Sequence, residues 1–291
     1  MKHLYRIAII ASACLLATSA VAQSLEKAWE TTTELKGPES AIYDAQRDII
    51  YISNVNGAPN EADGNGFIST MSTDGTITNL EWITGLNAPK GLTISGDKLY
   101  ASDINELIEI EIESGTIANR YKADGAQFLN DVAADGDGNI YVSDMVTDTV
   151  YRLSDGTFEA WLHDDMLENP NGLHIEGDKL IVGSWGKMTD GFNTEVPGHL
   201  KSVSLRDGAI TSLGSGAPVG NLDGVEADGN GNYYVTDWMA GKLFHITPAG
   251  DANALLELGP GSADHEVIAA QGLIVIPMMM DNKVIAYKIT Q

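Results

Sequence analysis

Six polar residues occupy one repeated position of this chain, each at the start of a short apolar run. They are Glu39, Lys90, Asn130, Asn171, Asp223 and His265. Packing alone does not explain a polar residue at every such start, and closure of the repeats into a ring would bring all six side chains together. Four of them (Glu39, Asn130, Asn171 and Asp223) carry the hard oxygen donors that calcium binds. The shared register therefore predicts a calcium-type site at the mouth of a ring.

A second apolar strand follows each of these runs after a tight turn, and its repeat gives the period. The equivalent positions are Tyr51, Tyr100, Tyr141, Ile181, Tyr234 and Val275. Successive differences between them are 49, 41, 40, 53 and 41 residues. Four strands in about 40 residues are typical of a β-propeller blade. The sequence thus predicts an all-β fold, a six-bladed β-propeller.

The two longer spacings contain insertions, at residues 56–66 and 186–198. Both follow the second strand of their blade, so we expect both on one rim. The sixth blade has only three strands before the C-terminus. We predict that an N-terminal strand, residues 29–35, completes it, because a closed ring hides an edge strand.

The first 22 residues have the pattern of a secretory signal peptide. A basic start and an apolar core over residues 7–19 precede a small-residue cleavage site, Ala20-Val21-Ala22. We therefore expect two segments, a signal peptide over 1–22 cleaved after Ala22 and a propeller over 23–291, and a periplasmic or secreted location. The single cysteine, Cys14, lies in the leader, so the mature chain has no thiolate for catalysis or metal binding.

The charge of the chain restricts its partners. It contains 17 Lys and Arg against 41 Asp and Glu, a formal net charge of −24. Such a field disfavours nucleic acid and anionic membranes and favours a metal cation. An acidic surface also keeps a protein soluble, and we expect most of these carboxylates to have this function alone.

Other polar residues have a simpler explanation. Asn171-Gly172 and Asp223-Gly224 are also common turn pairs, and Glu39 could be an ordinary surface acid. Asp103, Asp144 and Asp237 end second strands, where we expect them to tie neighbouring loops together. Two stretches that look calcium-like begin at Asp135 and Asp228, but they lack the spacing of an EF-hand and are predicted to be hairpin turns.

Candidates for lining a substrate mouth, or for ordinary packing, are Trp185, Trp238 and the Met278-Met279-Met280 run.

Four short segments together resemble the senescence marker protein/gluconolactonase family, which includes regucalcin and is related in architecture to paraoxonases and diisopropyl fluorophosphatase. The segments are Gly37-Pro38-Glu39-Ser40, Leu129-Asn130-Asp131, Pro170-Asn171-Gly172-Leu173 and Leu222-Asp223-Gly224-Val225. The resemblance implies a six-bladed propeller with one catalytic divalent metal in the central channel, calcium being our first choice.

The same resemblance implies roles for individual residues. Glu39, Asn171 and Asp223 would be the metal ligands, Asp223 would double as general base, and Asn130 would contact substrate or the metal. Lys90 departs from the pattern; its ammonium would hold a carboxylate, polarise a carbonyl or pair with Glu39. His265 would be a general base or would form hydrogen bonds within the tunnel. The segment before Asn130 lacks the arginine usual in sugar lactonases, so aldonolactone specificity does not carry over.

The expected function is metal-dependent hydrolysis of a lactone or related ester, a small-molecule substrate, with catalytic roles for Asp223, His265, Asn130 and Lys90. The alternative is a non-catalytic propeller that binds a small ligand or a protein partner, with a structural metal, since a propeller fold alone does not imply chemistry.

Overall fold

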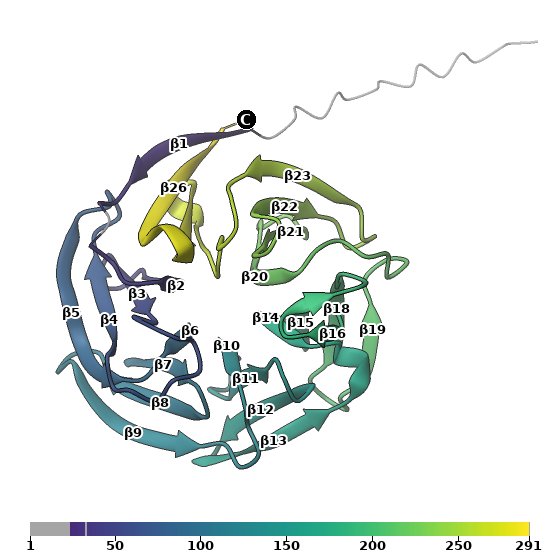
Figure 1. The fold of residues 1–291 in the computed structure, drawn as a ribbon, viewed down its shortest axis with the longest axis horizontal. Coiled ribbons are helices and arrows are strands. Elements are labelled where there is room, and N and C mark those ends of the chain that lie inside the picture. The colour runs from purple at the N-terminus through teal and green to yellow at the C-terminus, as the bar shows by residue number, and fades with distance from the viewer. Residues whose placement is uncertain (1–23, 33, 291) are drawn as a thin grey trace, which may run out of the picture.

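The computed structural model describes residues 24–32 and 34–290 and contains six four-stranded antiparallel sheets. Figure 1 shows the sheets set radially around one axis. The predicted fold class, an all-β six-bladed β-propeller, is confirmed. The predicted signal peptide over 1–22 lies outside the described residues. No helix in the described chain is long and apolar enough to cross a membrane.

Each blade is a meander whose first strand lies nearest the axis. Blade 1 contains β2 (Pro38–Asp44), β3 (Ile49–Asn54), β4 (Gly66–Met71) and β5 (Ile77–Leu86). Blade 2 contains β6 (Pro89–Ser95), β7 (Lys98–Asp103), β8 (Glu106–Glu111) and β9 (Thr116–Lys122). Blade 3 contains β10 (Leu129–Ala134), β11 (Ile140–Asp144), β12 (Thr149–Ser154) and β13 (Thr157–His163).

Blade 4 contains β14 (Pro170–Glu176), β15 (Lys179–Ser184), β18 (Leu200–Ser204) and β19 (Ile210–Ser212). Blade 5 contains β20 (Leu222–Ala227), β21 (Tyr233–Asp237), β22 (Lys242–Ile246) and β23 (Ala252–Glu257). Blade 6 contains β24 (Glu266–Ile268), β25 (Leu273–Met278), β26 (Lys283–Thr290) and β1 (Ser24–Glu30). Connections hold the hairpin of β16 (Met188–Asp190) and β17 (Asn193–Thr194) and three single-turn helices, Asp165–Leu167, Ala269–Gln271 and Met279–Asp281.

Six clusters of the hydrophobic core lie one between each pair of neighbouring blades. A seventh, smaller cluster consists of Phe128, Met145 and Trp185 in the connections between strands. Successive side chains of a strand point to opposite faces of its sheet. In β3, for example, Ile50 and Ile52 pack toward blade 6 and Tyr51 packs toward blade 2. Because both faces of each blade are covered by its neighbours, the inner edges that face the axis are free to carry polar groups.

The ring closes between blade 6 and the start of the described chain. Strand β1 pairs antiparallel with β26, from Ser24 opposite Thr290 to Glu30 opposite Ile285, and lies beside it in Figure 1. Our predicted strand, residues 29–35, is placed too late. Strand β1 is largely exposed and shows no apolar alternation; Trp29 lies within it, opposite Ala286, whereas Leu35 lies beyond its end. Leu35 is fully buried between blades 1 and 6.

Both insertions lie in connections from a second to a third strand, between β3 and β4 and between β15 and β18. Such connections share one face of a propeller with the segments that lead into the innermost strands, because successive strands run in opposite directions. The expectation of a common rim is therefore met by the topology.

A β-bulge interrupts the innermost strand of five blades at the same place. Pairing with the second strand skips residues 39–40, 90–91, 130–131, 171–172 and 223–224. A bulge bends a strand and re-aims its side chains. The polar position of the repeat is therefore a strand position turned toward the axis. The alternative that Asn171 and Asp223 are turn residues is wrong, because both lie inside strands.

Glycines that follow the polar position have a steric rather than a turn function. A Cβ added to Gly172 would lie 1.8 Å from the carbonyl oxygen of Asp223, and one added to Gly224 would lie 2.5 Å from Oδ1 of Asp264. Neither glycine has a positive φ. They are required because the innermost strands of neighbouring blades approach closely around the axis.

We expect Gly172→Ala to lower the free energy of unfolding by about 3 kcal/mol, since the added methyl overlaps a neighbouring backbone carbonyl. Gly136→Ala is the matched control, because its Cβ would meet nothing within 4 Å, and we expect a change of at most about 1 kcal/mol. Urea unfolding of both variants provides the measurement. Equal midpoints would show that the inner strands have room to move apart.

Candidate functional site

A cavity of about 120 Å³ opens at the rim that carries the insertions and contains five of the six predicted residues. Glu39, Lys90, Asn130, Asn171 and Asp223 line its inner part, and each is at most 6% exposed. The remaining lining residues are apolar: Pro59, Phe128, Met145, Trp185, Phe192, Trp238 and Met279. The repeated register thus brings these five polar side chains to one place.

Three of the oxygen donors form a hydrogen-bonded chain across blades 3, 4 and 5. The Asn130 amide donates to Oδ1 of Asn171. Asn171 Nδ2 in turn donates to Oδ1 of Asp223 and to the Leu222 carbonyl, both at 3.1 Å. These contacts fix the orientations of both amides and hold the Asp223 carboxylate in the cavity.

Glu39 completes the set from blade 1 and is not satisfied. Its Oε2 is buried and has no hydrogen-bond partner among the described residues. Burial, and then the negative charge of Asp223, raise the pKa of Glu39 well above its usual value. Burial and Asp131 likewise raise the pKa of Asp223, against the hydrogen bond from Asn171. Two buried carboxylates with this electrostatic penalty are an environment that a cation would stabilise.

The donor set fits a hard divalent cation. Its members offer two carboxylates and amide oxygens, which suit calcium. Among the described residues, no group of three His, Cys, Asp or Glu side chains is arranged to hold a metal. A metal in this cavity would therefore depend on the amide oxygens of Asn171 and Asn130 together with the carboxylates of Glu39 and Asp223.

Lys90 lies in the same cavity but does not bridge to Glu39. Its ammonium donates to the Ala88 carbonyl at 3.0 Å and lies 4.4 Å from the centre of the Phe128 ring. Burial lowers the pKa of Lys90 to about 8, although the charges of Glu39 and Asp103 act in the opposite direction. The lysine thus keeps its positive charge for the most part at pH 7 and loses it more readily than an exposed lysine does.

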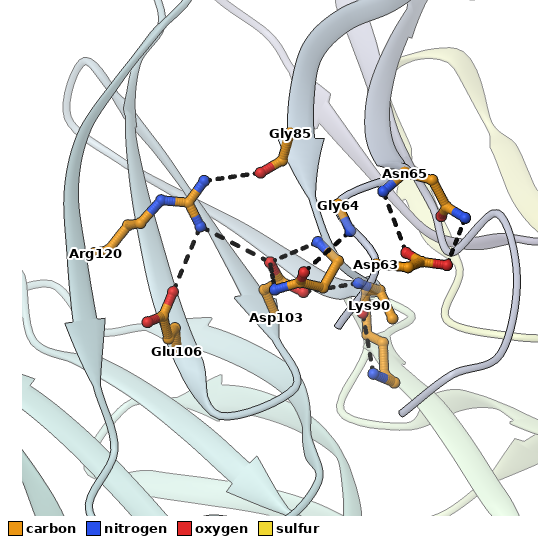
Figure 2. Close-up of polar contacts among 10 residues, drawn as sticks. Asp63, Gly64, Asn65, Gly85, Lys90, Asp103, Glu106 and Arg120 are labelled. Carbon is orange, nitrogen blue, oxygen red and sulfur yellow. Dashed lines mark hydrogen bonds and ion pairs between the residues drawn. The ribbon is translucent and has the colours of Figure 1, made fainter. Parts of the chain in front are cut away.

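The segment beneath Lys90 is anchored from the outer part of blade 2 (Figure 2). The buried Asp103 carboxylate accepts the backbone N–H groups of Asn87 and Ala88 at 2.9 and 2.8 Å. Arg120 lies 4.0 Å from Asp103 and donates to the Gly85 carbonyl at 3.0 Å. Asp103 therefore holds the loop that presents Lys90, as the sequence predicts for aspartates at the ends of second strands.

Asp144 and Asp237 have the same structural function in blades 3 and 5. Asp144 accepts the backbone N–H of Gln127 at 2.7 Å, and Asp237 accepts that of Asn221, in the segment before β20. The calcium-like stretch at Asp135 is a hairpin turn, in which this carboxylate accepts backbone N–H groups of its own loop.

His265 follows the same ring, next to the inner strand of blade 5, but its side chain is not exposed to the mouth cavity. It does not line the mouth cavity, it is fully buried, and neither ring nitrogen has a hydrogen-bond partner among the described residues. Burial, with a contribution from His174, lowers the pKa of His265 to about 3. The imidazole is therefore neutral near pH 7, and its pKa is not poised for base catalysis there.

A second cavity, of about 250 Å³, lies further along the innermost strands and was not predicted. Its charged lining consists of Asp131, His174, Glu226, Asp264 and Glu266. His174 and Glu226 form an ion pair at 3.4 Å when the histidine is protonated, and Asp264 accepts the Ser40 hydroxyl at 2.6 Å. The signal was present in the sequence as polar residues within three places of the repeated position, on either side of it.

Of the mouth candidates, Trp185, Trp238 and Met279 line the first cavity. Met278 packs in the core between blades 5 and 6, and Met280 is exposed. Phe128, Met145 and Phe192 were missed because an isolated apolar residue in a connecting segment has no periodicity to reveal it.

Comparison with known proteins places this geometry in context. The model of the SMP-30/gluconolactonase/LRE-like region matches residues 37–262. No curated protein sequence matches the chain. Solved structures with the same fold include a gluconolactonase from Xanthomonas campestris, at 15% identity and a TM-score of 0.67, covering 91% of this chain and 89% of that one.

A catalytically inactive virginiamycin B lyase from Staphylococcus aureus, solved with quinupristin, is 14% identical with a TM-score of 0.64, covering 92% of this chain and all of that one. A streptogramin B lyase is 13% identical with the same TM-score, covering 92% and 98%. At such low identity these structures show a common fold and nothing more.

We expect Glu266→Gln to change the pH dependence of stability. Burial, with the charge of Glu226, raises the pKa of Glu266 to about 8. A carboxyl with a raised pKa in the folded state stabilises fully below its unfolded pKa of about 4.5, and this contribution is lost as pH rises through about 8. The variant should therefore be more stable than the parent at pH 9, by at least about 1 kcal/mol, and similar to it near pH 5.

Urea unfolding between pH 5 and pH 9 measures this difference. The charge-matched control is Glu195→Gln, which removes one negative charge from an exposed position of the blade 4 insertion. Parallel pH profiles of the parent and Glu266→Gln would contradict the prediction.

Proposed function

Because the chain belongs to the SMP-30/gluconolactonase/LRE-like family, we propose that it hydrolyses a lactone or a related ester with the help of a divalent metal of the calcium type. The observation that carries the proposal is the mouth cavity, where buried oxygen donors from four blades meet and one carboxylate oxygen of Glu39 has no partner in the described chain. A small-molecule substrate follows from the size of this cavity.

Glu39, Asn171 and Asp223 would hold the metal, and Asn130 would extend the set or orient the substrate. The metal would supply Lewis-acid polarisation of the substrate carbonyl. The support for these roles is their common burial in one cavity and their oxygen chemistry.

The residues of the chain would carry out the proton transfers and the positioning. Asp223 would take a proton from the water that attacks the carbonyl carbon. The acyl carbon–oxygen bond then breaks, and the proton passes to the departing alkoxide, so a lactone and water give a hydroxy acid. We assign the base to Asp223 rather than to His265, because Asp223 lines the cavity and His265 does not.

Lys90 would act on the substrate rather than on the metal, since an ammonium has no lone pair to offer. Its position between the Ala88 carbonyl and the Phe128 ring places a positive charge in the cavity wall. There it can stabilise negative charge that develops on the substrate.

A periplasmic or extracellular location is also part of the proposal. It is supported by the leader pattern of residues 1–22.

We expect calorimetry on chelator-treated protein to show about one strong calcium site and Asp223→Asn to weaken it at least tenfold. This change keeps the shape and the hydrogen bond from Asn171 but removes a negative charge. Hydrolysis of a lactone and aryl-ester panel should fall about a hundredfold or more with loss of the base. The control is Asp137→Asn, in an exposed hairpin turn.

Absence of binding for calcium, magnesium, manganese and zinc, or equal binding by the variant, would refute the ligand assignment. Metal binding without turnover of any member of the panel would favour the non-catalytic alternative.

The variant Lys90→Met distinguishes an effect of Lys90 on turnover of the substrate from an effect on metal affinity. Methionine preserves the packing against Phe128 but removes the charge, so we expect metal affinity to stay within about tenfold while kcat falls. Calorimetry and steady-state kinetics on the same preparation measure the two effects. A variant that loses the metal, or one that retains full activity, would contradict this role.

A further inference from the structure

The mouth cavity separates polar from apolar groups. Its inner end carries the five polar residues of the repeat, whereas all of its other lining side chains are apolar or aromatic. The outer lining includes Phe128, Trp185, Phe192 and Trp238. A substrate bound with its carbonyl at the inner end would therefore extend the rest of its structure between aromatic walls.

The aromatic wall is a built structure. The ring centroids of Phe128 and Phe192 are 5.6 Å apart, and Trp185 lies 6.2 Å from both Phe192 and Trp238. The indole N–H of Trp185 donates to the Phe192 carbonyl at 2.8 Å. It is thereby engaged within the wall and is not offered to a hydroxyl of a bound molecule.

A side-chain amide from blade 5 holds the insertion that carries Phe192. Asn221 Nδ2 donates to the Trp185 carbonyl at 2.9 Å and to the Thr194 hydroxyl at 3.0 Å. The hairpin of β16 and β17 is thus fixed against the neighbouring blade, and the position of Phe192 at the mouth is determined by the fold.

Exposed large apolar residues gather on the same face of the molecule. Those of the described chain are Val146, Met166, Phe192, Val196, Met239 and Met280. Met166 lies in the connection from β13 to β14, and the other five lie in connections from second to third strands. Both kinds of connection belong to the mouth face, so the apolar character of the cavity wall continues onto the rim around it.

We infer that the substrate is a lactone or ester with a sizeable apolar substituent, an alkyl chain or an aryl group, and not a polyhydroxylated ring. This inference rests on the proposed hydrolysis and deepens it. A cavity of about 120 Å³ is small beside the roughly 300–1,000 Å³ of common ligand pockets. It accommodates the reacting ring, and the substituent lies along the aromatic wall and the apolar rim.

The physical reason is the difference between burying methylenes and burying hydroxyls. Each buried methylene gains free energy because apolar surface leaves water, whereas a hydroxyl that loses its water without a new hydrogen-bond partner is destabilised. Along these apolar walls, a substituent with several hydroxyls would incur this desolvation penalty once for each hydroxyl.

A series of δ-lactones with one ring and different substituents tests the inference. With calcium present, kcat/KM should rise about fourfold per methylene over the first several carbons, from δ-valerolactone through methyl, pentyl and heptyl derivatives. Glucono-δ-lactone, corrected for spontaneous hydrolysis, should be the poorest substrate. Phe192→Ala should flatten the dependence on chain length. Phe192 is 41% exposed, so its truncation does not remove a buried core residue.

Phe158→Ala is the aromatic control, since Phe158 lies in outer strand β13 and packs on Tyr151. It should keep the parental dependence on chain length. A preference for glucono-δ-lactone, or rates independent of chain length, would overturn the inference and leave the proposed hydrolase intact.

Binding of the same series, followed by tryptophan fluorescence, separates the remaining outcomes. If no lactone is hydrolysed but affinity rises with chain length and falls in Phe192→Ala, the apolar site stands and the hydrolase proposal fails. If neither turnover nor chain-length-dependent binding is found, both are overturned.

Discussion

The burial of both faces of every blade is the constraint on which the rest of this structure depends. Each sheet packs its two faces against two neighbours, and six apolar clusters fill the spaces between them. Folding energy is therefore gained between the blades. The residues at the axis do not have to contribute apolar packing. Polar groups can therefore be buried at the centre of the ring, namely Glu39, Lys90, Asn130, Asn171 and Asp223.

The geometry of the site follows from two local devices repeated around that ring. A bulge turns the polar side chain toward the axis, and glycines such as Gly172 and Gly224 let adjacent inner strands approach closely. The approach explains the electrostatic character of the site. Carboxylates from different blades are forced into one poorly hydrated space, which raises the pKa values of Glu39 and Asp223.

Periodicity made most of the fold predictable from the sequence, because the blade repeat and its hairpin turns are local patterns. The polar register also located five residues of the mouth cavity. Strand β1 was misplaced because an exposed outer strand carries no apolar alternation. The aromatic wall and the environment of His265 could not be derived, since they depend on how connections from different blades lie beside one another. The second cavity was overlooked although Asp131 and His174 stand close to the repeated position.

The closing sheet joins the two ends of the described chain. Strand β1 comes from its beginning and β26 from its end, and the hydroxyls of Ser24 and Thr290 lie 2.7 Å apart across this pair. During synthesis, five blades can form in order, but the sixth must wait until β26 has left the ribosome. A pairing across 266 residues is the most costly contact in loop-closure entropy. A circular permutation that links the two ends of the described chain and opens the ring between two other blades would move the slow strand pairing to those blades.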